Sequence, residues 1–169
     1  FYKAISGEYE KTRVCCFTSK NDNPLFWSHY ANSHKGYCVR FAVTDNPQSV
    51  IHNARQIVYS EDYPTITFPI MTKLVKALIP FFRKSKEWEY EDEYRSIFSP
   101  HWVKQPENNG ESLSLTNDKI TDVYFGAKMS DEDKKDVIQL IDDGPFTPKI
   151  WQAKTHGSKY ELEFEAYKL

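Results

Sequence analysis

The clearest pattern in this sequence is an alternation of apolar and acidic residues near its C-terminal end. Residues 160–166 read YELEFEA, so every second side chain is apolar and the ones between are glutamates. Side chains of a strand point alternately to opposite faces, and this pattern is typical of a strand with one buried and one solvated face. A second apolar run, 149–155, precedes it, and residues 156–158 (HGS) suit a short turn. We expect a hairpin of strands 149–155 and 159–167.

Further segments of strand and helix precede this hairpin. Asn23 followed by Pro24 is a helix-start signal, since asparagine caps a helix and proline fits its first turn, and Gly36 suits the end of that helix. Ser130 before an acidic turn gives a similar start. The patterns predict strands at 14–18, 37–43, 55–59, 93–98 and 120–125, helices at 24–34, 70–79 and 131–141, and a surface loop at 102–117. The expected fold is therefore α+β, a mixed, mostly antiparallel sheet of six or seven strands with about three helices.

Composition narrows the class of protein. The 169 residues are 40% hydrophobic and 27% charged, close to ordinary globular usage. The chain has no 18-residue apolar run, no signal-peptide pattern at its start, and only three cysteines. We expect a soluble cytoplasmic protein, no membrane partner, and a single domain over 1–169. Because Phe1 rather than methionine opens the chain, we expect the domain to lack an N-terminal segment.

Charge is divided unevenly along the chain. Residues 1–84 carry a net charge of +5 and residues 85–169 a net charge of −7, which leaves −2 overall. A basic half facing an acidic half could frame a cleft for an anionic ligand, although such linear bias also disperses on folding. The overall acidity does not favour nucleic acid as a partner.

A first group of chemistry-bearing residues surrounds the predicted helix 24–34. Trp27, Tyr30, Ala31 and His34 have the spacing of one helical face. His29 and His34 are five residues apart, so they do not share a face, and the chain has no CxxC or HxxxH spacing; we therefore expect no metal site. The chain also lacks GxSxG, GxGxxG and Walker motifs, which argues against a serine hydrolase, a Rossmann fold and a P-loop. Trp27, His29, Tyr30 and His34 remain ligand-binding candidates, with fold-locking as the alternative for Trp27.

The second group is the run 84–95, KSKEWEYEDEYR. If 93–98 is a strand, Glu93 and Arg95 share a face and project about 7 Å apart. A carboxylate at a strand end beside aromatic rings can stabilise an oxocarbenium-like centre or act as a general base, and the arginine can bind an anion. The alternative is a solvated strand edge with a Glu–Arg ion pair that contributes little. Glu93 and Glu91 are the catalytic candidates, and Tyr94 and Arg95 are the ligand-binding ones.

These two groups resemble the signatures of a bacterial family, "domain of unknown function 2971". The resembling residues are 16–18 (CFT), 23–31 (NPLFWSHYA), 34–41 (HKGYCVRF), 58–59 (VY), the W-x-YE-x-EYR pattern of 88–95 and the strand 120–126. They follow the family's order over roughly residues 13–127. Thr18 replaces the usual serine, and the family's N-terminal strand and FNDP-like motif are not present.

A broader resemblance, to ADP-ribosyltransferase-like domains, implies an activity. In those domains a late glutamate binds the nicotinamide-ribose hydroxyl and stabilises the oxocarbenium ion as nicotinamide leaves. The corresponding residue is Glu93, with Glu91 as second choice, and Tyr30 or Tyr94 is the stacking residue. The resemblance implies cleavage of the nicotinamide glycosidic bond of NAD, as an ADP-ribosyltransferase or NAD glycohydrolase, in a toxin or phage-defence setting. NAD is then the substrate, and no cofactor is required.

Two other functions stay open. The first is a nucleotide- or protein-binding sensing module without catalysis, in which both groups form a recognition pocket. The second is a nuclease that uses His29 or His34 with Glu91 or Glu93. A nucleotide-type small molecule is the expected ligand, and the sequence does not identify a protein partner.

Overall fold

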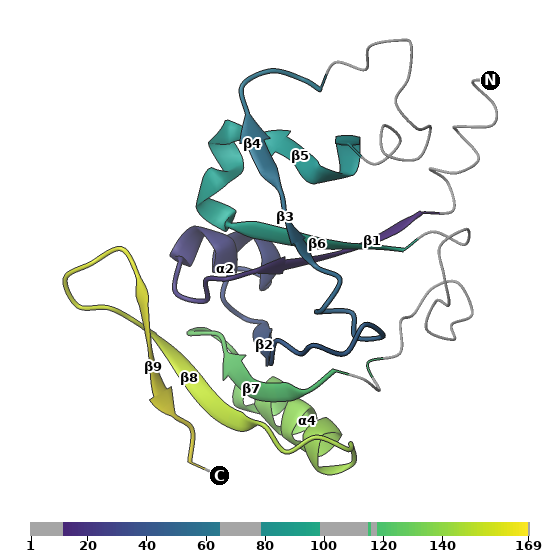
Figure 1. Cartoon of the computed structure of the whole chain (residues 1–169). Helices are drawn as coiled ribbons and strands as arrows, with labels where there is room; N and C mark the ends of the chain where they lie inside the picture. The colour runs from purple at the N-terminus through teal and green to yellow at the C-terminus, as the bar shows by residue number, and fades with distance from the viewer. Residues whose placement is uncertain (1–11, 65–78, 99–114, 116–117, 169) are drawn as a thin grey trace, which may run out of the picture. The chain divides into compact units, whose positions relative to one another are not determined.

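The computed structural model describes residues 12–64, 79–98, 115 and 118–168, which form two compact units. Each unit combines segments that are far apart in the sequence: residues 20–44 belong with 118–169, while 1–19 belong with 45–117. Figure 1 shows the elements of both. The predicted helix 70–79 and loop 102–117 fall almost entirely outside the described residues.

The first unit contains a three-stranded antiparallel sheet in the order β1-β6-β3, from β1 (Arg13–Thr18), β6 (Glu93–Phe98) and β3 (Arg55–Gln56). Beside it, β4 (Val58–Ser60) and β5 (Arg83–Ser85) pair in parallel. Two 3-10 helices, η1 (Ile79–Phe82) and η2 (Lys86–Glu91), flank β5. The predicted strand 55–59 is split in two because its halves pair with different strands. β3 pairs with β6, and the buried Ile57 extends that pairing by donating its N–H to Glu93 O at 3.1 Å, whereas β4 pairs with β5.

The second unit is a four-stranded sheet, β2-β7-β8-β9, with two α-helices. Its strands are β2 (Tyr37–Phe41), β7 (Ile120–Phe125), β8 (Lys149–Thr155) and β9 (Leu162–Ala166), and its helices are α2 (Pro24–Tyr30) and α4 (Asp131–Asp142). Only the β7–β8 pairing is parallel in this sheet. The α+β class is confirmed, and four of the six strand pairings are antiparallel, with nine described strands distributed over three sheets instead of one.

Both predicted helix caps are present. The Asn23 side chain accepts from Leu25 N at 2.9 Å, and Ser130 Oγ accepts from Asp133 N at 3.1 Å. The acidic first turn of α4 suits the positive end of its helix dipole.

The first helix ends earlier than the sequence predicted, at Tyr30 instead of residue 34. Asn32, Ser33 and His34 all have positive φ, 47°, 55° and 68°, so the chain makes a left-handed turn that no right-handed helix can continue. Gly36 N then bonds to Ala31 O at 2.8 Å. His34 therefore does not continue the helical face of Trp27, which corrects that prediction.

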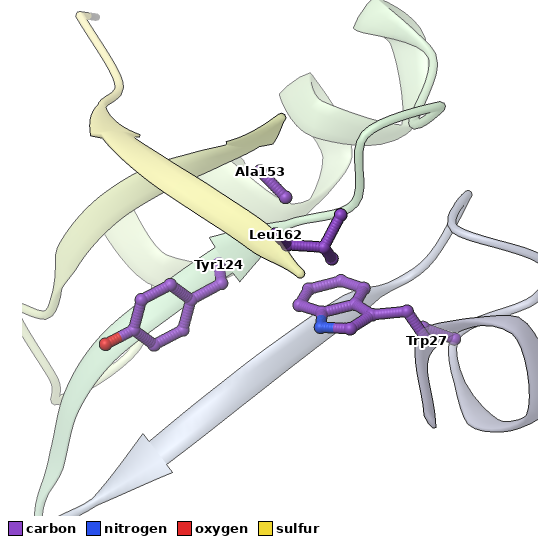
Figure 2. Close-up of a cluster of buried hydrophobic side chains, with 5 residues drawn as sticks. Trp27, Tyr124, Ala153 and Leu162 are labelled. Carbon is purple, nitrogen blue, oxygen red and sulfur yellow. The ribbon is translucent and has the colours of Figure 1, made fainter. Parts of the chain in front are cut away.

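Two hydrophobic clusters cover the two faces of the second unit's sheet. On one face, Trp27 packs with Tyr124, Ala153 and Leu162. Figure 2 shows the indole of Trp27 pointing toward Leu162. On the other face, α4 packs on Val123 and Phe125 through Val137, Ile138 and Ile141. Trp27 thus fixes α2 to the sheet.

Strand ends differ slightly from the sequence predictions. β2 ends at Phe41 rather than at 43, and β9 begins at Leu162 rather than at 159. The residues before β9 form the hairpin turn, where His156 Nδ1 accepts from Ser158 N at 3.1 Å and Lys159 N at 3.2 Å. Among the described residues, no helix has the length and apolar character of a membrane-spanning segment.

Candidate functional site

Glu93 begins β6, the central strand of the first unit's antiparallel sheet. Its partner across the sheet on β1 is Thr18, and Cys16 stands opposite Arg95 two residues along. Because side chains alternate along a strand, Glu93 and Arg95 lie on one face and Tyr94 lies on the other. The predicted ligand-binding residue Tyr94 therefore does not share the face of Glu93.

The carboxylate of Glu93 is held by two basic side chains. Arg95 Nε donates to Oε1 at 2.6 Å and Arg95 Nη2 to Oε2 at 3.0 Å, while Lys84 Nζ lies 3.0 Å from Oε2. The backbone N–H of Glu93 donates to Tyr59 Oη at 2.8 Å. Glu93 is 5% exposed, so this ion pair is buried on a central strand rather than solvated at an edge.

Lys84 joins the second candidate carboxylate to the first. Its ammonium pairs with Glu91 as well as with Glu93, and it lies 5.0 Å from the centre of the Trp88 ring. Glu91 is 2% exposed, and its carbonyl accepts from Thr18 Oγ1 at 2.6 Å. We call Lys84, Glu91, Glu93 and Arg95 the buried charge cluster. It holds two positive and two negative groups and is thus balanced.

The turn before β6 brings the two glutamates together. Asp92, between them, has φ of 45°, which ends η2 and starts the strand. Asp92 is tied by the Ser19 hydroxyl and by Gln56 Nε2, the latter at 3.0 Å from Oδ1. These bonds to β3 and to the residue after β1 fix the turn from both sides.

The contacts within the cluster favour the ionised forms of Glu93 and Lys84. Burial alone would raise the pKa of Glu93, but hydrogen bonds from Arg95, Cys16 and Lys84 outweigh it and lower the pKa to about 2. Burial likewise works against the charge of Lys84, yet its bonds to Glu91 and Glu93 raise the pKa of the ammonium. A carboxylate with so low a pKa is a weak base, so Glu93 is poorly suited to general-base catalysis.

Cys16 shares the face of the cluster. Partial burial, together with the nearby carboxylate of Glu93 that accepts from its thiol, raises the pKa of Cys16 to about 11. The thiol is therefore protonated at neutral pH and is a poor nucleophile.

The other group of predicted residues lies on or just after α2, in the second unit. The Trp27 indole is 2% exposed, and its Nε1 donates to Asn21 O at 2.6 Å. Tyr30 is 58% exposed and His29 is exposed beside it, with their ring centres 6.2 Å apart. Phe26 lies 4.8 Å from Tyr30, ring centre to ring centre. Of the four predicted residues, His29 and Tyr30 present their rings at the surface.

His34 forms a contact that the sequence did not indicate. Its Nε2 lies 3.0 Å from Ser28 Oγ, and the hydroxyl of Ser28 donates to Pro24 O at 3.0 Å. The imidazole is neutral near pH 7, since burial and then Lys128 lower its pKa. Nδ1 is buried and has no hydrogen-bond partner, which favours the tautomer with the proton on Nε2 and Ser28 as acceptor. In that arrangement the histidine does not activate the serine, because it offers the hydroxyl no free lone pair.

The structure thus groups Glu91, Glu93 and Arg95 in one unit, and Trp27, His29, Tyr30 and His34 in the other. Within the described ranges, no cluster of three or more His, Cys, Asp or Glu side chains could hold a metal ion.

The candidate residues of α2 and of β6 both lie inside one match to a protein family of unknown function. The match runs from within α2 to within β6. Residues 26–96 match DUF2971. The family resemblance predicted from the sequence is therefore confirmed, and the DUF2971 stretch contributes to both units. Searches of curated proteins and of solved structures find no match. The resemblance to ADP-ribosyltransferase-like domains stays a prediction.

Proposed function

We propose that this DUF2971 protein is a sensing module that binds a nucleotide-type small molecule on the exposed rings of α2 and does not change it chemically. The observation that carries the proposal is that both catalytic candidates are buried and ion-paired. Glu91 and Glu93 are 2% and 5% exposed and are already bound by Lys84 and Arg95. Breaking such a buried pair costs about 3–5 kcal/mol, which a substrate hydroxyl would have to repay.

The rings of α2 offer a different kind of surface. The Tyr30 ring is in contact with the rings of Phe26 and His29, and 58% of the residue is exposed to solvent. Every nucleobase has a face that stacks on such rings, worth about 1–3 kcal/mol per base. This supports a base or nicotinamide ring as the part that is recognised.

The surface is also rigid before any ligand binds. Trp27, one turn away, is buried in the sheet and bonded to Asn21, and the Asn23 cap and Pro24 fix the start of the helix. A preformed surface loses little conformational entropy on binding, which favours affinity.

The enzymatic alternative, cleavage of the nicotinamide glycosidic bond of NAD by Glu93, stays a prediction, as does the toxin or phage-defence setting. It requires the ionised carboxylate of Glu93 to exchange its Lys84 or Arg95 partner for the ribose hydroxyl. The nuclease reading also stays a prediction, and no contact of the described residues favours it.

Calorimetry of the whole chain with NAD, ATP and GTP tests the proposal. We expect heat of binding with at least one nucleotide, and Tyr30→Ala should weaken it about tenfold, as loss of one stacking contact does. Tyr160→Ala is the matched control, because Tyr160 is fully exposed in the hairpin turn. The proposal is wrong if none of the nucleotides binds, or if Tyr30→Ala and Tyr160→Ala bind equally well. Binding of a protein and of no nucleotide would favour a protein-recognition module.

A further inference from the structure

β9 forms an edge of the second unit's sheet (Figure 1). Half of the backbone groups of an edge strand point away from its only neighbour, here β8. Tyr167 N bonds inward to Ile150 O at 2.9 Å, whereas Leu162 N bonds outward to Asp22 O at 2.7 Å. The backbone N–H and C=O groups of successive residues point alternately to the two sides of a strand. Those of Phe164 and Ala166 therefore point outward, as those of Leu162 do. Among the described residues, no backbone group bonds to the outward N–H or C=O of these two.

One backbone group of the outer edge is already hydrogen-bonded to another segment of the unit. The contact between Leu162 N and Asp22 O occupies its first position, and Phe164 and Ala166 supply the next two along the strand. Continuing this pairing would satisfy up to four backbone groups. Ala166 is exposed, so an added strand would displace water rather than protein at this position.

The side chains of β9 select which strand can be added. Glu163 and Glu165 lie on one face, and Glu165 pairs with Lys154 at 2.6 Å. Glu163 is exposed and has no ion pair with any basic side chain of the described residues. If a second copy of β9 paired here antiparallel about Phe164, Glu163 would stand opposite Glu165 of that copy, and like charges directly opposite are destabilising. The charges therefore disfavour self-pairing.

A strand with a basic residue at every second position has the complementary pattern. Its basic side chains would stand opposite Glu163 and Glu165, and its other side chains would lie beside Leu162 and Phe164. We infer that the outer edge of β9 binds an extended, alternately basic segment of a protein partner by strand addition. A hollow of about 660 Å³ near β9 is lined by Lys134, Glu165 and Lys168, among others. Because its lining carries both positive and negative side chains, its charge does not define a ligand.

This inference is independent of nucleotide binding on α2 and is tested with peptides. The probe is a short fluorescent peptide with lysine at every second position, compared with a peptide of the same composition whose lysines are grouped at one end. Fluorescence polarisation should show the alternating peptide binding about tenfold more tightly. Glu163→Lys should abolish that preference. Glu87→Lys, the same charge change at an exposed residue of the first unit, should leave it unchanged.

Ala166→Pro separates strand addition from simple charge attraction. Proline removes one outward N–H and leaves the bonds to β8 intact, and edge strands tolerate proline at such positions. We expect the variant to fold and to lose its binding of the alternating peptide. Equal binding of the two peptides, or unchanged binding by Ala166→Pro, would overturn the inference. A wild-type dimer in analytical ultracentrifugation that becomes a monomer in Ala166→Pro would also overturn it, because the outer edge of β9 would then pair with a second copy of the chain.

Discussion

Arg95 holds both carboxylate oxygens of Glu93, at 2.6 Å from Nε and 3.0 Å from Nη2, although the two residues are only two apart on β6. Arg95 also donates from Nη1 to Phe81 O at 2.6 Å, which links the strand to η1. A guanidinium bound in this way is fixed in orientation. The pair therefore connects the central strand of the first unit to its neighbours.

Glu93→Gln should destabilise the protein. The substitution leaves Lys84 and Arg95 partly buried without their shared anion, and removing one partner of a buried ion pair costs about 3–5 kcal/mol. Urea unfolding followed by circular dichroism measures the loss. Glu163→Gln, at an exposed glutamate of β9, should change the free energy of unfolding by less than about 0.5 kcal/mol. Equal stability of the two variants would show that the cluster contributes nothing to the fold.

The stability conferred by Glu93 should depend on pH in the acidic range. Its pKa is about 2 when folded and near 4.5 ordinarily, so below about pH 5 the unfolded chain binds the proton first. The free energy of unfolding should therefore fall as pH drops from about 5 to about 2, and Glu93 should contribute fully above that window. Urea midpoints of the wild type and Glu93→Gln should converge on acidification. A difference that stays constant down to about pH 2 would contradict the low pKa.

Cys16 should react slowly with iodoacetamide until Glu93 is neutralised. The pKa of Cys16 is raised to about 11 partly by the Glu93 carboxylate, whereas burial alone raises that of Cys38 to about 11. Because the thiolate is the reacting form, Glu93→Gln should accelerate alkylation of Cys16 several-fold and leave Cys38 unchanged. Mass spectrometry of the digested protein reports each site. If alkylation of both cysteines accelerates, the variant has opened the fold rather than lowered the pKa of Cys16 alone.

Gly126 should not tolerate a side chain. A Cβ there would lie 2.1 Å from His34 O and 2.7 Å from Gly36 O, which are backbone atoms held by bonds to Lys128 N and Gly126 N. Gly126→Ala must push these segments apart, and we expect a loss of about 3 kcal/mol or more. Gly157→Ala is the matched control, because nothing lies within 4 Å of its Cβ position. Similar melting temperatures for the two variants would contradict the close packing.

Local patterns predicted much of the fold. The Asn23 and Ser130 caps, the strands 93–98, 120–125 and 149–155, and the shared face of Glu93 and Arg95 are all present. Each depends on residues close in the sequence, where periodicity and capping chemistry act directly.

Features that depend on residues far apart in the sequence could not be predicted from local patterns. The left-handed turn at Asn32–His34 depends on Gly126, nearly a hundred residues on, which lets His34 O and Gly36 O approach. The burial of Glu93 depends on Lys84 and on β6 being central, and neither follows from alternation along one strand. The Ser28–His34 contact follows from that same left-handed turn, so helical spacing did not indicate it.

The most direct test of the account is nicotinamide release from NAD by the wild-type chain and by Glu93→Gln, measured by chromatography, with circular dichroism confirming that both are folded. The account predicts no release above the rate in buffer from either protein, because the carboxylate of Glu93 is committed to Arg95 and Lys84. Release by the wild type that Glu93→Gln abolishes would contradict it and would assign Glu93 a catalytic role.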